Sequence, residues 1–130
     1  LAGLRLGFVI GNDKDVAGIA EMSGPWPVSG AAIAIGRAAL ADRSWARQTT
    51  ARLVSETARL DALDTEAGWN LVGGTPLFRL YDAGAAERAQ SRLAESAIWT
   101  RRFPWSQGWI RLGLPGSAAE WSRLERALER

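Results

Sequence analysis

Large hydrophobic residues recur at every second position from Leu4 to Ile10 in the opening segment LAGLRLGFVI. A period of two is typical of a β-strand, and apolar residues occur on both faces, as in a strand covered on two sides. A chain of this size supplies few partners for such a strand, so we expect an orphan strand of a larger sheet. The chain starts at Leu1 rather than at methionine, and we expect a segment upstream of it. One face of the predicted strand carries Leu4, Leu6, Phe8 and Ile10, and the other carries Arg5, Gly7 and Val9.

After residue 12 the apolar residues adopt the three- and four-residue spacing of amphipathic helices. Asn12 or Asp13 is placed to cap a short helix that ends near Met22, before the segment SGPWPVSG interrupts the pattern with prolines and glycines. We expect a second helix from about Ser29 to Leu40 and a longer one that starts near Ser44 and ends at Gly68. The long helix carries one stripe, made of Trp45, Thr49, Leu53, Leu60, Leu63 and Ala67.

Short strands alternate with helices in the rest of the chain. The predicted strands span residues 69–72 and 77–81, joined through the Gly73 and Gly74 pair, and then residues 98–101 and 109–114. A helix over about residues 85–96 separates the two pairs of strands. A final helix begins at a capping box formed by Ser117 and Glu120, and its buried face comprises Trp121, Leu124 and Leu128. The pattern predicts an α/β (α+β) fold, in which helices pack on one face of a short-stranded sheet.

Composition narrows the classes of function. The chain has 130 residues, of which 47% are hydrophobic, and this suits a single compact core. It contains no cysteine and no histidine, which excludes disulfides and histidine-based triads, and we predict no metal site. The net charge is only +2, so nucleic acid is not an expected partner. No apolar run approaches the roughly 20 residues of a membrane span, and we predict a cytoplasmic protein with no membrane partner.

One arginine lies within an apolar strand. Arg111 is flanked by Ile110 and Leu112. A buried ion is costly unless it is paired or hydrated, and a guanidinium group matches a carboxylate or a phosphate better than other side chains do. Arg111 is therefore a candidate for binding an anion. The alternative is that it points to solvent from a half-exposed strand.

Several motifs resemble one enzyme family. The opening LAGLRLGF is similar to the segment that follows the Schiff-base lysine in fold-type I pyridoxal-phosphate (PLP) enzymes of the class I and II aminotransferase superfamily. GPWPVSGAAIAIGRAAL resembles a loop and helix start of that superfamily, and GGTPLFRL resembles the strands that open its small domain. The resemblance implies that residues 1–28 are a remnant of the large PLP-binding domain and the interdomain segment. Residues 29–130 are then the C-terminal small domain.

The resemblance also implies roles for three arginines. In the family, the arginine of the opening motif binds the phosphate of the cofactor, and this role falls here on Arg5. The segment with Arg101 and Arg102, followed by a loop and by GWIR, is similar to the part that holds the anionic groups of the substrate. For a phosphorylated substrate we expect Arg111 to bind the carboxylate and Arg101 to bind the phosphate. The predicted cofactor-binding residue is therefore Arg5, and the predicted substrate-binding residues are Arg101 and Arg111.

Within the superfamily, the motifs are most similar to those of the threonine-phosphate decarboxylases of cobalamin biosynthesis. Histidinol-phosphate aminotransferases are near relatives, and amino transfer is the alternative reaction. The resemblance depends on PWPVSG, GGTPLFRL and RRFP with GWIRLGLPG taken together. It implies a homodimeric, cytoplasmic PLP enzyme that acts on a phosphorylated amino acid. The expected reaction converts L-threonine O-3-phosphate to (R)-1-amino-2-propanol O-2-phosphate.

The chain departs from the family pattern in its lysine. Its one lysine, Lys14, lies in the polar segment GNDKDV and does not occupy the Schiff-base position, which would precede Leu1. We therefore predict no catalytic lysine within the chain. We also predict that the chain alone is inactive and does not bind PLP.

The alternative from another class of function is a non-catalytic structural or interaction domain. The apolar strand from Leu4 to Ile10 would present an edge with which a second copy can pair. Two other arginines receive no role. Arg79 is free to point to solvent from a half-buried strand, and Arg102 can cover a neighbouring aromatic ring with its stem.

Overall fold

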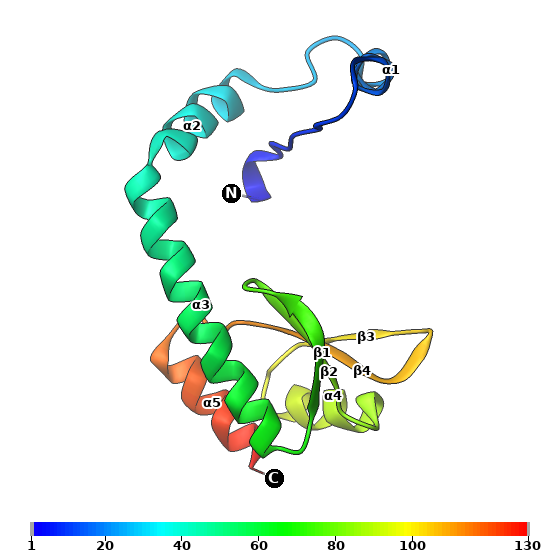
Figure 1. Cartoon of the computed structure of the whole chain (residues 1–130), viewed down its shortest axis with the longest axis vertical. Coiled ribbons are helices and arrows are strands. Elements are labelled where there is room, and N and C mark those ends of the chain that lie inside the picture. The colour runs from blue at the N-terminus through cyan, green and yellow to red at the C-terminus, as the bar shows by residue number, and fades with distance from the viewer. Residues whose placement is uncertain (1, 130) are drawn as a thin grey trace. The chain divides into compact units, whose positions relative to one another are not determined.

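Figure 1 shows the chain as a computed structural model, which describes residues 2–129. The chain divides into two compact units, Leu1–Ala46 and Arg47–Arg130. None of the helices formed by residues 2–129 is long and apolar enough to cross a lipid bilayer. The first unit contains α1 (Asp13–Ser23) and α2 (Gly30–Ala41), and α3 (Arg43–Glu66) runs across the boundary between the units.

The strand predicted over the first ten residues does not form. Ala2–Leu4 make a 3-10 turn, Arg5 has a φ of 54°, and residues 6–10 belong to no strand, while Leu1 lies outside the described residues. A strand needs neighbours that satisfy its N–H and C=O groups, and all strands of the described chain belong to one sheet in the second unit. The hypothesis of an interaction domain depended on pairing through this strand, and residues 2–10 form no such strand.

The two helices of the first unit begin where the sequence predicts. The side chain of Asn12 accepts a hydrogen bond from the N–H of Asp15 at 3.0 Å, and that of Ser29 accepts one from the N–H of Ala32 at 3.2 Å. These contacts satisfy N–H groups that have no partner within the helix. The predicted helices that start at Asn12 or Asp13 and near Ser29 are confirmed.

The second unit is built on an antiparallel sheet of four strands in the order β1-β2-β4-β3. Helices α4 and α5 lie on the same face of this sheet (Figure 1). The strands are β1 (Asn70–Thr75), β2 (Phe78–Asp82), β3 (Arg101–Phe103) and β4 (Ser106–Gly113), and the helices are α4 (Ala86–Glu95) and α5 (Ala118–Leu128).

The apolar core lies between that face of the sheet and the helices. Tyr81 on β2 and Ile110 and Leu112 on β4 point into it, and none of them is more than 3% exposed. The mixed α/β fold with helices on one face of a small sheet is confirmed, and so is the predicted buried face of α5. The helices contribute Leu60 from α3, Leu93 from α4, and Trp121, Leu124 and Leu128 from α5.

Two local predictions need correction. Gly73 and Gly74 lie within β1 rather than between the strands, and the turn that joins β1 to β2 lies at residues 76–77. The third strand starts at Arg101 rather than at residue 98. The carbonyl of Thr100 accepts a hydrogen bond from the Gln90 side chain of α4 at 2.8 Å, so this backbone acceptor is satisfied by a helix and not by a neighbouring strand.

The final helix starts as predicted. Ser117 Oγ accepts a hydrogen bond from the N–H of Glu120 at 3.3 Å, and the Glu120 carboxylate accepts one from the N–H of Ser117 at 2.9 Å. This is the expected capping box. The predicted boundary between residues 28 and 29 concerns the domains of a larger enzyme and stays a prediction.

Gly74 provides a test of the β1–β2 hairpin. Its φ is 150°, and a Cβ there would lie 2.3 Å from the carbonyl oxygen of Phe78, whereas a Cβ on Gly73 would meet nothing within 4 Å. We expect Gly74→Ala to lower the free energy of unfolding by about 2–4 kcal/mol, because a strand backbone cannot move aside as a flexible side chain would. Gly73→Ala is the matched control, with an expected change below about 1 kcal/mol. Urea denaturation measures both, and equal effects would contradict this hairpin geometry.

Candidate functional site

The register of the sheet places two predicted site residues opposite each other. Arg101 on β3 pairs with Arg111 on β4. Paired residues of antiparallel strands point to the same face, and successive residues of a strand point to opposite faces. Because Ile110 and Leu112 point into the core, Arg111 and Arg101 point to the face that is turned away from α4 and α5. We call this the arginine face, and by register it also carries Phe78 and Leu80.

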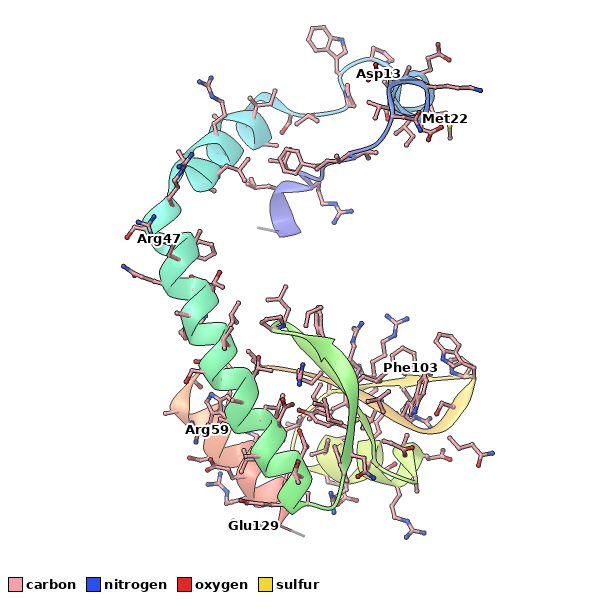
Figure 2. All side chains as sticks on the ribbon, in the orientation of Figure 1. Asp13, Met22, Arg47, Arg59, Phe103 and Glu129 are labelled. Carbon is pink, nitrogen blue, oxygen red and sulfur yellow. The ribbon has the colours of Figure 1, made fainter. Side chains whose placement is uncertain are left out.

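Each guanidinium group of the arginine face lies over an aromatic ring. Cζ of Arg111 is 4.4 Å from the ring centroid of Phe78, and Cζ of Arg101 is 5.7 Å from that of Phe103. Phe103 is labelled in Figure 2. Neither arginine forms an ion pair with a carboxylate among residues 2–129. Two adjacent cations without a counter-ion repel each other, so an anion that binds between them is favoured.

Two other arginines of the sheet, Arg102 and Arg79, do have polar side-chain partners. Arg102 Nε donates a hydrogen bond to the Gln90 side chain at 2.7 Å, and its guanidinium lies 3.6 Å from Glu87. Arg79 donates two hydrogen bonds to Asp61, at 2.9 and 2.5 Å. The expectations that Arg79 points to solvent and that Arg102 only covers an aromatic ring are therefore wrong. Because successive residues of a strand point to opposite faces, Arg101 lies on the arginine face and Arg102 does not.

Asp61 is the centre of a polar network on the helical side of the sheet. It accepts the hydroxyl hydrogen of Tyr81 at 2.6 Å in addition to the two bonds from Arg79. Burial pushes the pKa of Asp61 upward, but the hydrogen bonds from Arg79 and Tyr81 prevail and hold this pKa below its ordinary value. Burial, together with the hydrogen bond to Asp61, raises the pKa of Tyr81. The network keeps a negative charge on α3 and ties this helix to β2.

Asp64, almost one turn further along α3, is buried without a partner. The residue is 0% exposed, and neither carboxylate oxygen has a hydrogen-bond partner among residues 2–129. The Tyr81 hydroxyl gives its hydrogen to Asp61 instead. Burial raises the pKa of Asp64 to about 7 against the opposing effect of the Tyr81 hydroxyl, and the charge of Asp61 adds to the increase. A large part of Asp64 is therefore protonated at neutral pH.

Arg5 belongs to the other unit. It is exposed, directly follows the 3-10 turn, and forms no ion pair with any residue in the range 2–129. Lys14 is exposed in the first turn of α1. The structure thus brings Arg101 and Arg111 together on one sheet and places Arg5 in a separate unit. The roles of all three stay predictions.

Two features of the site were missed by sequence reasoning. The first is the pair of rings under the guanidinium groups. The spacing of Arg101 and Phe103 in one strand is a signal for their contact, but the contact of Arg111 with Phe78 depends on the register between β2 and β4. The second is the Asp61 network, for which the sequence shows only a helix with carboxylates near its end and a nearby strand.

Comparisons with known proteins agree with the resemblance seen in the motifs. The sequence pattern of the family "Aminotransferase class I and II" matches residues 1–130. The chain is 42% identical over 130 residues to a threonine-phosphate decarboxylase of Sinorhizobium sp, which covers 100% of this chain. It is 41% identical over 129 residues, 98% of this chain, to a threonine-phosphate decarboxylase of Pseudomonas aeruginosa.

A more distant relative is histidinol-phosphate aminotransferase 2 of Gluconobacter oxydans, at 31% identity over 135 residues and 98% of this chain. In all three comparisons the match covers 38% of the relative. The chain therefore spans less than half the length of the curated relatives that it matches.

The buried Asp64 predicts how stability depends on pH. An aspartate has an ordinary pKa of 3.8, and that of Asp64 in the folded chain is about 7. A group whose folded pKa is raised contributes stability that is fully present below the unfolded pKa and is lost as the pH rises to the folded value. The second unit should therefore lose stability from about pH 4 to about pH 7, by about 4 kcal/mol in total, and level off above that. Asp61 does not contribute in this window, because its lowered pKa places its titration below it.

Urea denaturation between about pH 5 and about pH 8 measures this slope. The chain has no histidine, so few other groups titrate there. Asp64→Asn should remove the slope, and Glu66→Gln, an exposed position on the same helix, should keep it. A slope that persists in Asp64→Asn would show that another group is its source.

Proposed function

Because the chain belongs to the class I and II aminotransferase family, we propose that it is the C-terminal part of a PLP enzyme that decarboxylates L-threonine O-3-phosphate. The decarboxylase relatives, at 42% and 41% identity, support this reaction over that of the histidinol-phosphate aminotransferase at 31%. The observation that carries the proposal is the arginine face. On it, Arg101 and Arg111 lie opposite each other, and neither is paired with a carboxylate of the described chain.

The substrate is matched to this face by charge. A phosphorylated amino acid has two anionic groups, a carboxylate and a phosphate, and each fits a guanidinium fork. Arg111 is half-buried on the central strand β4, and Arg101 is exposed on the edge strand β3. In this proposal Arg111 binds the carboxylate, and Arg101 binds the phosphate.

Arg111 has the stronger influence on the reaction. PLP, when bound, accepts the electron pair of the bond that breaks at the substrate Cα. The residue that orients the substrate carboxylate would therefore select which bond at Cα breaks. For decarboxylation, Arg111 would hold the carboxylate in the orientation in which it is lost as CO2, with a proton taking its place on Cα. For amino transfer, the same contact would keep the carboxylate bound while the Cα proton leaves.

Arg5 is the residue of this chain that we propose to bind the phosphate of the cofactor. Its guanidinium is exposed and has no ion pair within residues 2–129, which fits contact with a phosphate group. Lys14 does not suit the covalent anchor, because it is an exposed residue in the first turn of α1 with Asp13 and Asp15 as neighbours. The anchor must then come from outside this chain, and the proposal includes that the chain alone is inactive.

The family resemblance supports three further parts of the proposal. The product, (R)-1-amino-2-propanol O-2-phosphate, is used in cobalamin biosynthesis. The enzyme is a homodimer, and it acts in the cytoplasm. The second candidate function is amino transfer to or from a phosphorylated amino alcohol such as histidinol phosphate, for which the relative from Gluconobacter oxydans is the supporting observation. Release of CO2 from L-threonine O-3-phosphate distinguishes the two.

Kinetics of a complete enzyme that includes this chain test the substrate roles. We expect Arg111→Ala and Arg101→Ala each to raise the KM for L-threonine O-3-phosphate by roughly 10- to 100-fold, because each removes a charge-assisted contact to the substrate. Arg102→Ala is the matched control with a small expected effect, since Arg102 is directed to Gln90. Unchanged kinetics in Arg101→Ala or in Arg111→Ala would remove that residue from the site.

Chemical trapping tests the inactivity of the chain alone. We expect that the isolated chain, incubated with an equimolar amount of PLP and reduced with borohydride, keeps its unmodified mass, because no lysine is placed to hold the aldehyde. Peptide mapping identifies any modified residue. Stoichiometric modification of Lys14, together with CO2 release from L-threonine O-3-phosphate, would contradict this part of the proposal.

A further inference from the structure

We propose that Phe78 is a positioning residue for Arg111: its ring holds the guanidinium group in place and leaves the N–H donors of that group free for the substrate. The inference rests on the proposed function, since it concerns how the arginine face binds the anionic groups of a phosphorylated amino acid. It assigns a role to a residue that does not itself carry charge.

The register of the sheet makes this contact specific. Phe78 pairs with Gly113, and Leu80 pairs with Arg111, so Phe78 and Arg111 are diagonal neighbours on the same face of β2 and β4. Gly113 has no side chain, and a Cβ there would lie 3.9 Å from the Phe78 ring. Gly113 therefore places no side chain against the ring, and Cζ of Arg111 lies 4.4 Å from the ring centroid.

The backbone of Phe78 is fixed by the hairpin. Thr75 pairs with Phe78, and Gly74 approaches the carbonyl oxygen of Phe78 so closely that only a residue without Cβ fits. Phe78 itself is 47% exposed. Phe78 thus has a fixed backbone and an exposed ring, which suits a platform for another side chain better than a place in the core.

A ring and a carboxylate hold an arginine in different ways. The carboxylate of Asp61 binds Arg79 through two of its N–H groups and cancels its charge. A ring attracts the guanidinium through its face, so the five N–H donors in the plane of the group stay available. Arg111 has the ring and no carboxylate among residues 2–129, as expected of a cation that is ordered but still able to bind an anion.

Arg101 shows a weaker form of the same arrangement. Its Cζ lies 5.7 Å from the ring of Phe103, near the limit of about 6 Å for such contacts. Arg101 is also exposed, whereas Arg111 is half-buried. The positioning role is therefore assigned to Phe78, and Phe103 serves as the comparison.

Nuclear magnetic resonance of the isolated chain tests the role without the cofactor. The Nε–Hε signal of Arg111 reports its order and the ring current of Phe78. We expect Phe78→Leu to shift this signal towards that of an exposed arginine and to increase its mobility, and Phe78→Tyr to leave both unchanged. Phe103→Leu is the matched control and should leave the Arg111 signal in place. Backbone amide spectra show that each variant keeps the sheet.

Titration with L-threonine O-3-phosphate gives the second measurement. We expect Phe78→Leu to raise the apparent dissociation constant reported by the Arg111 signal by about threefold to tenfold, and Phe78→Tyr to restore it. If Phe78→Leu is folded and both the free signal and the affinity are unchanged, the positioning role is overturned. If the Arg111 signal depends on Phe78 but does not respond to the ligand even in the unsubstituted chain, the positioning is supported and the proposed substrate site is contradicted.

Discussion

The antiparallel register of β4 between β2 and β3 is the constraint on which the site depends. Successive residues of β4 point to opposite faces, so the burial of Ile110 and Leu112 turns Arg111 to the other side. The same register brings Arg101 opposite Arg111. A slip of one residue would place Arg111 in the core and expose the two aliphatic side chains. The free energy of burying those apolar side chains therefore also determines where the cations lie.

The charges of the second unit are separated between the two sides of the sheet. On the helical side, Asp61 is bonded to Arg79 and Tyr81, and Asp64 is buried and partly protonated. On the other side, Arg101 and Arg111 lie over aromatic rings. A carboxylate beside these arginines would compete with an anionic ligand, and the helices keep Asp61 and Asp64 away from them. The same helices support the strand that carries Arg111, so the core and the site are built from the same elements.

Much of the fold could be predicted from the sequence, and the reasons for success and failure are physical. Helix starts were predictable because Asn12, Ser29 and Ser117 are local caps, and the buried face of α5 follows from its spacing. The absence of a strand over the first ten residues could not be predicted, because a strand forms only with partners and the described chain offers none there. Of the site, the candidate arginines could be chosen from the sequence. The contact with Phe78 and the burial of Asp64 could not, since both depend on contacts between segments far apart in the chain.

A crystal structure of the chain with L-threonine O-3-phosphate would show directly whether Arg101 and Arg111 bind the substrate. We expect one ligand on the arginine face, with its two anionic groups within hydrogen-bond distance, about 2.7–2.9 Å, of the guanidinium groups of Arg101 and Arg111. A structure in which these arginines point to opposite faces of the sheet, or in which each is paired with a carboxylate of the protein and the ligand binds elsewhere, would contradict this expectation.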